Sequence, residues 1–429
     1  MEKLLLQHAR ILDPSSNLDV IGDLLLEDGL LKQVGGTVEA PDAQVFDAKG
    51  LVAAPGLVDM HVHLRDPGFT EKEDIFTGCR AAAAGGVTSL LCMPNTKPAI
   101  DTPDTVRYIL DKAAEADAHV YVAAAITKGL QSNELDDLEA LREAGAIALS
   151  DDGRPVVDSR LMARAMRAAP SLGMRVVSHC EDLDLSKGGL MNEGDVSREL
   201  GVPGVPAAAE DCGTARDIAL AEAYQVPIHI CHVSSRTSVA MIRDAKRRGV
   251  QVTAETAPHY FSLTDAMLRA RDADFRMSPP LRTESDRLAV IEGLRDGTID
   301  AIATDHAPHT PAEKADFSKA PNGSIGMETS LAAGITYLVK TGLLTLRELL
   351  RLMSTAPANL LHIPAGTLNP GAPADIVLFD PEEQWTVEPE KLHGKSRNAV
   401  FKGRILTGRV KLTVCRGKIV YRGGNEGRI

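Results

Sequence analysis

Short apolar runs alternate with helical patterns eight times along the middle of the chain, and this alternation restricts the fold more than any other feature. Each run is rich in Val, Ile, Leu and Ala, and most are followed by a segment with the apolar spacing of an amphipathic helix. The expected strands cover residues 56–65, 86–95, 118–127, 146–152, 174–182, 227–235, 250–260 and 301–309. Eight strands with intervening helices predict an α/β fold, a parallel (β/α)8 TIM barrel, which typically takes ~250 residues.

Both ends of the chain differ from this middle part. Residues 3–58 and 374–422 contain short β-like runs separated by turns, and the stretch GRVKLTVCRGKIVYRGG alternates as a half-buried antiparallel strand does. Because chain ends tend to lie close together, we expect both ends to build one small β-sandwich module. The expected division is residues 1–54 for the first part of this module, 55–365 for the barrel and 366–429 for the second part.

Composition excludes several classes of protein. The chain of 429 residues has 47 basic and 59 acidic side chains and a formal net charge of −12, whereas a general nucleic-acid binder would carry a basic face. No apolar run approaches the ~18 residues of a transmembrane helix, and the start of the chain lacks the apolar core of a secretory signal. Six cysteines without a CxxC pair favour a reducing compartment. We therefore expect a cytoplasmic protein that binds neither membranes nor nucleic acid.

Histidines and aspartates stand at the ends of five expected strands, where barrels of this kind place their active sites. In chain order they are His61 and His63, Asp151 and Asp152, His179, His232 and Asp305. Residues two apart on a strand point to the same side, so both imidazoles of the first strand can face one point. Nitrogen and carboxylate ligands suit Zn²⁺, and this set exceeds what one tetrahedral ion needs. The pattern predicts a site for two metal ions.

The alternation of side chains along a strand separates neighbouring candidates. His229 and His232 are three residues apart, so they would face opposite sides of a regular strand. His232 is nearer the C-terminal end, and we expect it in the site and His229 against a helix. Asp151 and Asp152 cannot both point inward for the same reason.

The motifs around these residues resemble those of the amidohydrolase superfamily and, within it, those of the type I dihydroorotases. In chain order the matching stretches are DMHVHLRDPG, MPNT, SDDGRPV, SHCED, CHVSS, TAPHY, MSPPLR, TDHAPH and PNGSIGMET. The resemblance runs through the whole chain. It implies a zinc-dependent hydrolase of de novo pyrimidine biosynthesis that interconverts N-carbamoyl-L-aspartate and L-dihydroorotate. It also implies a homodimer and allows an association with aspartate transcarbamoylase.

The resemblance assigns the metal ligands residue by residue. They are His61, His63, Asp152, His179, His232 and Asp305. Many relatives bridge two metal ions with a carboxylated lysine on the fourth strand, but this chain has only aspartates there, and the family spacing to the SHCED histidine favours Asp152 over Asp151 as the bridge. Asp305 is also implied as the general base that takes the proton of the attacking water and returns it to the departing amide nitrogen.

Substrate contacts follow from the same resemblance. Arg65 and Asn95 would hold the substrate carboxylate, and a guanidinium group binds a carboxylate through two parallel hydrogen bonds. His309 would also reach the substrate, and backbone groups of Pro321 and Gly323 would pair with the ring amides.

One substrate-facing position departs from the family pattern. Ser278 stands where relatives usually have an asparagine, in MSPPLR instead of MNPPLR. A hydroxyl is shorter than an amide and has one donor where an amide has two, which puts this contact in question.

Other functions remain as alternatives at this stage. A hydantoinase or allantoinase would act on a ring without a carboxylate, which leaves Arg65 and Asn95 without a role. A non-catalytic subunit that supports aspartate transcarbamoylase would keep the barrel and lose ligands, whereas all six ligand positions are filled here. Two long connections, 183–213 and 310–327, are expected to be functional or mobile, and a partner could be needed to order the second.

Overall fold

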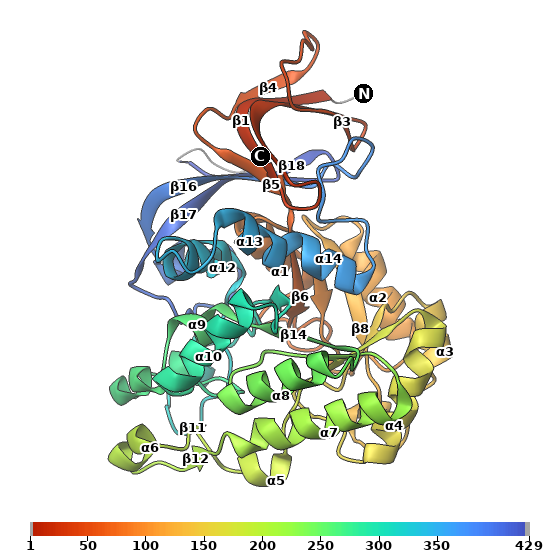
Figure 1. Ribbon diagram of the computed structural model, residues 1–429, viewed down its shortest axis with the longest axis vertical. Coiled ribbons are helices and arrows are strands. Elements are labelled where there is room, and N and C mark those ends of the chain that lie inside the picture. Colours follow the sequence, from red (N-terminus) through yellow and green to blue (C-terminus); the bar gives the residue numbers. More distant parts are fainter. Residues whose placement is uncertain (1–2, 425–429) are drawn as a thin grey trace.

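Eight parallel strands form a barrel in the computed structural model, which describes residues 3–424 (Figure 1). They are β6 (Leu57–Val62), β7 (Val87–Cys92), β8 (His119–Ala124), β9 (Ala148–Leu149), β10 (Arg175–Ser178), β13 (Ile228–Ile230), β14 (Val252–Thr256) and β15 (Ala301–Ile302). The sheet closes where Val62 pairs with His306 in a parallel bridge, and the His63 N–H donates to the His306 carbonyl at 2.9 Å. The expected (β/α)8 barrel is confirmed.

A helix follows each barrel strand before the next one begins. These helices are α1 (Ile75–Ala84), α2 (Pro103–Ala113), α3 (Leu138–Glu143), α4 (Ser159–Ala168), α7 (Ala208–Tyr224), α8 (Arg236–Arg247), α10 (Glu284–Arg295) and α12 (Met327–Gly334). Several begin at a side-chain cap, as at Asp74 and Thr102, which accept the N–H groups of Thr77 and Thr105. No helix within residues 3–424 is long and apolar enough to cross a membrane.

The barrel strands are shorter than the sequence predicts. Residues 146–152, expected as one strand, form only the two-residue β9, and β15 is equally short. The chain leaves the sheet just before the polar residues, so that His63, Asp152, His179, His232 and Asp305 all follow the last residue of their strands. Their backbones are therefore free of strand pairing and can adopt conformations that a sheet does not allow.

The lower part of the barrel interior is apolar. Its core includes Val58, Met60, Leu91, Ala123, Val177 and Ala301, and α14 (Ala356–Leu361) closes it from below through Ala358 and Leu361. The pairing of β6 with β7 shifts register between Asp59 and Val62. A shift of this kind changes which residues face inward, so His61 and His63 can join the interior although Val58 and Met60 already do.

Both long connections contain secondary structure. The segment after β10 holds α5 (Leu183–Ser186), β11 (Met191–Asn192), α6 (Asp195–Leu200) and β12 (Gly204–Val205), and the segment after β15 holds α11 (Pro311–Lys314). The remaining helical elements are η1 (Lys128–Leu130), η2 (Ala169–Leu172), α9 (Pro258–Ser262), η3 (Asp265–Ala270), η4 (Ala273–Phe275), η5 (Ile335–Val339), α13 (Leu346–Leu350), η6 (Arg351–Thr355) and η7 (Pro389–Lys391).

The two ends of the chain meet in a β-sandwich module at one end of the barrel (Figure 1). Its strands are β1 (Lys3–Asp13), β2 (Leu18–Glu27), β3 (Leu30–Val34), β4 (Gln44–Asp47), β5 (Val52–Pro55), β16 (Ile376–Thr386), β17 (Ile405–Cys415) and β18 (Lys418–Arg422). Antiparallel pairing of β5 with β16 joins the N-terminal strands to the C-terminal ones, and β17 and β18 are antiparallel, as predicted. The expected segments 1–54 and 366–429 extend beyond the described residues at both ends.

Candidate active site

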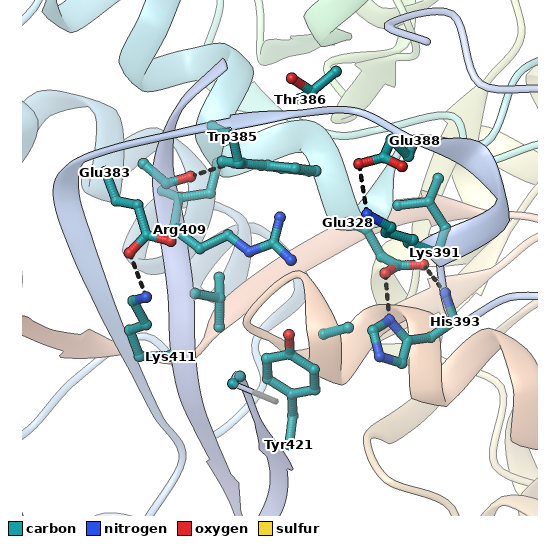
Figure 2. A pocket seen from close by; sticks show the side chains of 18 residues that line it. Glu328, Glu383, Trp385, Thr386, Glu388, Lys391, His393, Arg409, Lys411 and Tyr421 are labelled. Carbon is teal, nitrogen blue, oxygen red and sulfur yellow. Dashed lines mark hydrogen bonds and ion pairs between the residues drawn. The ribbon is translucent and has the colours of Figure 1, made fainter. Parts of the chain in front are cut away.

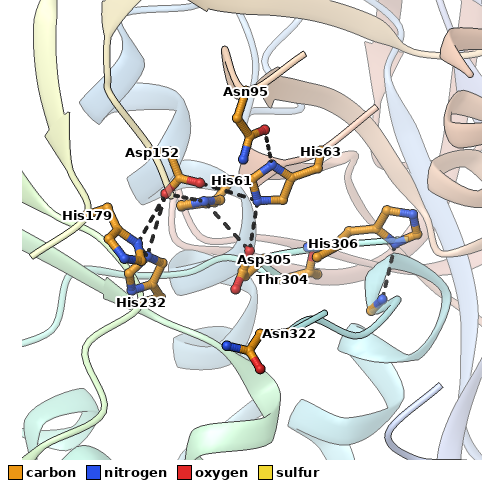
Figure 3. Close-up of polar contacts among 12 residues, drawn as sticks. His61, His63, Asn95, Asp152, His179, His232, Thr304, Asp305, His306 and Asn322 are labelled. Atoms are coloured by element: carbon orange, nitrogen blue, oxygen red, sulfur yellow. Dashed lines mark hydrogen bonds and ion pairs between the residues drawn. The ribbon is translucent and has the colours of Figure 1, made fainter. Parts of the chain in front are cut away.

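Six polar side chains converge at the C-terminal ends of the barrel strands (Figure 3). They are His61, His63, Asp152, His179, His232 and Asp305, and all are buried. His232 and Asp305 have positive φ angles of 37° and 49°, a left-handed conformation that is costly for residues other than glycine. Strain of this kind concentrates at functional sites, where the surrounding fold holds it in place.

One side of this cluster joins the first strand to the fourth and the eighth. The His61 Nε2 lies 3.2 Å from the Asp152 Oδ1 and 3.7 Å from the Asp305 Oδ1. The His63 Nε2 lies 3.1 Å from the Asp305 Oδ1 and 3.5 Å from the Asp152 Oδ2. Four side chains thus surround one point.

The other side of the cluster joins the fifth strand to the sixth. The His179 Nδ1 lies 2.8 Å from the His232 Nε2, and these two nitrogens lie 3.5 and 3.7 Å from the Asp152 Oδ1. Asp152 therefore stands between both histidine pairs, in the position that a ligand shared by two metal ions requires. Asp151 points elsewhere: its carboxylate accepts the Ile126 and Thr127 N–H groups at 2.7 and 3.1 Å.

The donor atoms of the cluster fit a metal better than they fit one another. Among the described residues, the buried His61 Nε2 and Asp152 Oδ1 have no hydrogen-bond partner, although they face each other. Burial would raise the pKa of the Asp152 carboxyl, but the neighbouring histidines hold it well below its usual range, so this group is ionised. A cation bound between these nitrogens and carboxylate oxygens would satisfy them together, and such a donor set is typical of Zn²⁺ sites.

Three polar side chains hold the outer nitrogens of the candidate ligands. Glu255, at the end of β14, lies 3.0 Å from the His61 Nδ1, and the Asn95 Oδ1 lies 2.8 Å from the His63 Nδ1. The Glu181 Oε2 lies 3.0 Å from the His179 Nε2. Such contacts fix the tautomer and orientation of a ligating imidazole. Sequence analysis missed Glu181 and Glu255, although both stand at strand ends, in SHCED and TAET.

A cavity of about 360 Å³ opens above the cluster. On one side it is lined by His63, Asp152, His179, His232 and Asp305, and on the other by Arg65, Asn95, Ser278, His309, Asn322 and Gly323. Leu190 and Val205, from the long connection after β10, complete the wall. The size suits a small molecule, and the cavity brings most of the predicted substrate contacts to the predicted metal ligands.

Arg65 supplies a buried positive charge at this cavity. Its φ angle is +61°, its Nε donates to the Pro308 carbonyl at 3.2 Å, and its Nη2 lies 3.4 Å from the His309 Nε2. Burial lowers the pKa of Arg65 to about 10, so the guanidinium stays protonated at neutral pH. The His309 Nε2 in turn donates to the Asn322 carbonyl at 2.8 Å. A locally positive pocket is thus present in an acidic protein, as an anionic ligand requires.

Of the remaining predicted substrate contacts, Ser278 lines the cavity and Pro321 does not. The Ser278 Oγ reaches the cavity and lies 3.5 Å from the Glu181 Oε1. Pro321 does not line the cavity, and its carbonyl accepts the Lys314 ammonium at 2.9 Å. Asn322 and Gly323 border the cavity instead, so the backbone available to a ligand lies one residue further along the chain.

The prediction that His229 packs against a helix is wrong. Its Nδ1 lies 2.9 Å from the Thr253 Oγ1 and its Nε2 lies 3.3 Å from the Glu255 Oε2, and both partners belong to the neighbouring strand β14. The alternation argument fails because β13 ends at Ile230 and His232 has a positive φ. The kink turns His232 inward, so both histidines face the barrel interior.

A second cavity, of about 370 Å³, lies between the β-module and α12 (Figure 2). Its charged side chains pair with one another, as Lys411 with Glu383, Lys391 with Glu388 and His393 with Glu328. Arg409 packs over the Trp385 ring, 4.1 Å from its centroid. The candidate metal-ligand clusters within residues 3–424 lie elsewhere, and the catalytic candidate is the cavity at the barrel mouth.

Comparisons with known proteins agree with this assignment. Residues 50–238 match the family model described as Dihydro-orotase-like. Two relatives named Dihydroorotase, from Geobacter metallireducens and Syntrophus aciditrophicus, are 51% and 52% identical, with alignments that cover 98% of this chain and 99% of each relative. The structure is similar to L-hydantoinase (dihydropyrimidinase) from Arthrobacter aurescens, with a TM-score of 0.87, 25% identity and 99% and 97% of the two chains covered. D-hydantoinase (dihydropyrimidinase) from Thermus sp. gives a TM-score of 0.83 and 27% identity, with 98% and 97% covered.

Proposed function

The chain belongs to the dihydroorotase family, and from this premise we propose that it interconverts L-dihydroorotate and N-carbamoyl-L-aspartate in pyrimidine biosynthesis. The observation that carries the proposal is the position of Arg65, a buried cation that faces the same cavity as the metal-ligand cluster. Dihydroorotate carries a ring carboxylate beside the amide to be hydrolysed. A hydantoin or allantoin ring has no such carboxylate, so those substrates leave this buried charge without a partner.

Two zinc ions are the metal content that we propose. His61, His63 and Asp305 would hold one ion, His179 and His232 the other, and Asp152 both. Zinc bound there would lower the pKa of a bound water and polarise the ring amide carbonyl. Metal analysis of the purified protein tests the stoichiometry: about two zinc per chain is expected, and a chain without metal would favour the non-catalytic alternative.

Asp305 would carry the proton in this reaction. Its Oδ1 lies within 3.7 Å of both imidazoles of the first strand, at the cavity wall. Burial would raise the pKa of Asp305, but His63 and its neighbours hold it below its usual range, so the carboxylate is ionised. It would take the proton of the attacking water and return it to the departing amide nitrogen. In the cyclisation direction the same transfers run backward.

Arg65 would bind the substrate carboxylate, with the free amide nitrogen of Asn95 as a second donor. The Asn95 Oδ1 is already engaged by His63, so this asparagine would link substrate binding to a metal ligand. His309 and the backbone of Asn322 and Gly323 border the opposite wall, where the ring amides would lie. Ser278 also faces the cavity, but its hydroxyl is directed to Glu181.

Hydrolysis of dihydroorotate, hydantoin and allantoin by one purified sample tests the proposed substrate. We expect turnover of dihydroorotate, with at least tenfold higher KM in Arg65→Met, since one charge-assisted pair contributes about 1.5–3 kcal/mol. Asp305→Asn should lower kcat by about 10²–10⁴-fold while most bound zinc remains. Lys319→Met, in an exposed part of the loop after β15, serves as the control and should change neither value. A preference for hydantoin, or an unchanged KM in Arg65→Met, would contradict the assignment.

The location and assembly of the chain are also proposals. We expect a cytoplasmic homodimer, which sedimentation of the purified protein tests directly. An association with aspartate transcarbamoylase is a further proposal, and co-elution of the two proteins at equal concentration would support it.

A further inference from the structure

A line of buried polar groups runs below His61 into the barrel interior. Glu255 on β14 and His229 on β13 are 1% and 0% exposed. Within residues 3–424 the Glu255 carboxylate forms ion pairs with His61 and His229 only, and with no lysine or arginine. A carboxylate buried without a permanent cation is costly, and an apolar side chain would fill the same space without that cost. The free-energy cost of burying Glu255 therefore indicates that this carboxylate has a function.

Contacts along this line favour one arrangement of the protons. The Glu255 Oε1 lies 3.0 Å from the His61 Nδ1, so this nitrogen carries a hydrogen, and the Nε2, which faces Asp152, is the nitrogen available to a metal. At the far end, the Thr253 hydroxyl lies 2.9 Å from the His229 Nδ1. A hydroxyl that donates there leaves the hydrogen of His229 on Nε2, which lies 3.3 Å from the Glu255 Oε2.

The line therefore has one consistent direction. In this arrangement Thr253 donates to His229, the His229 Nε2 hydrogen faces Glu255, and Glu255 accepts from His61. The other acceptor for the Thr253 hydroxyl, the Ile228 carbonyl, is more distant at 3.5 Å. Each oxygen of the Glu255 carboxylate thus faces one imidazole nitrogen. The 3.3 Å contact is an ion-pair distance and not an aligned hydrogen bond, since among the described residues neither the His229 Nε2 nor the Glu255 Oε2 has a hydrogen-bond partner.

We propose that Glu255 and His229 are positioning residues that hold His61 in the tautomer and orientation required to bind metal. This inference rests on the proposed function in one respect only, that His61 is a metal ligand. Neither residue lines the cavity, so neither contacts the substrate. Outer contacts of this type typically change metal affinity by about 10–100-fold when they are removed.

Zinc affinity of the metal-free protein, measured by competition with a chromophoric chelator, tests the proposal without reference to turnover. In Glu255→Gln one side of the amide still accepts from His61, but the other presents N–H against the N–H of His229. We expect about 10–100-fold weaker binding of zinc. Thr253→Val, which keeps the shape and removes the donor, should weaken binding less, and Thr253→Ser should restore it.

Asp375→Asn is the matched control, since it makes the same exchange of a buried carboxylate for an amide at the opposite end of the barrel. Asp375 is 5% exposed, accepts the Arg416 N–H at 2.8 Å and lies 3.0 Å from His119 at the start of β8. Its zinc affinity at the catalytic cluster should equal that of the wild type.

The outcomes distinguish a failure of the positioning role from a failure of the proposed function. If wild type binds zinc and Glu255→Gln and Thr253→Val bind it equally well, the positioning role is wrong. If Glu255→Gln does not fold, the Thr253 pair of variants decides alone, because both keep the carboxylate. If wild type binds no zinc, the proposed function fails, and the positioning role fails with it. When zinc is saturating, kcat in Glu255→Gln should recover toward the wild-type value, because the variant still holds every catalytic group.

Discussion

Lys314 is a half-buried ammonium in the loop after β15, which borders the active-site cavity through Asn322 and Gly323. Its replacement by methionine gives a prediction with a defined pH dependence. Its Nζ donates to the carbonyls of Ala273 at 2.9 Å, Arg276 at 3.4 Å and Pro321 at 2.9 Å. These bonds tie α11 to the segment after β14. Burial lowers the pKa of Lys314 from 10.5 to about 8.

The direction in which folding stability changes with pH follows from proton binding in the folded and the unfolded protein. Below pH 8 the lysine is protonated in both the folded and the unfolded protein, and its burial cost is constant. Between pH 8 and 10.5 the folded protein releases this proton while the unfolded chain keeps it, so folding stability rises with pH. A pKa shift of this size corresponds to a gain in folding stability of about 3.4 kcal/mol. Because Lys314 is partly exposed to solvent, we expect a gain of about 2–3 kcal/mol.

Scanning calorimetry of wild type and Lys314→Met, between about pH 7 and about pH 10.5, measures this effect. The unfolding entropy of a chain this long is about 0.9 kcal/mol per kelvin, so the Tm of wild type should rise relative to the variant by about 2–3 °C. Other groups titrate equally in both proteins and cancel, and Lys319→Met, an exposed lysine of the same loop, should show no such trend. A Tm difference that stays constant or falls with pH would refute the reasoning.

Three further predictions concern packing and the metal. Gly213→Ala places a Cβ 2.7 Å from the Glu181 N, which should displace α7 from the chain after β10, lower stability by about 1–3 kcal/mol and reduce the zinc content measured by atomic absorption. After removal of metal, zinc alone should restore full activity, since Asp152 needs no carbon dioxide, and a requirement for bicarbonate would contradict this role. Arg282→Met leaves the buried Glu210 without its cation and should cost about 3–5 kcal/mol in urea unfolding, much of it recovered in the double variant with Glu210→Gln.

The sequence predicts the barrel and the candidate ligands for one reason. In a parallel barrel the ends of all strands meet at one rim, so polar residues that follow apolar runs must converge, whatever the exact length of each strand. Asp152 and His232 illustrate this, because both reach the cluster although their strands end three and five residues earlier than the sequence predicts.

Local backbone geometry limits what the sequence can predict. The inward direction of His232 beside His229 depends on its own left-handed backbone, and that of His61 on the register shift in β6. Alternation rules assume a regular strand and cannot include either feature. Glu255 was missed for a related reason. A single carboxylate in an apolar strand indicates a role only when its contacts with the imidazoles of His61 and His229 are known.

The pairing of β5 with β16 has a consequence for how the protein is made. The two strands are separated by about 320 residues, and at a synthesis rate of about 5–20 residues per second β5 emerges roughly 16–64 s before its partner exists. During that time one edge of β5 is unpaired, and such an edge is a template for pairing with other chains. Nascent chains on one messenger RNA are close neighbours, so yield should depend on chaperones that cover this edge until the last strands leave the ribosome.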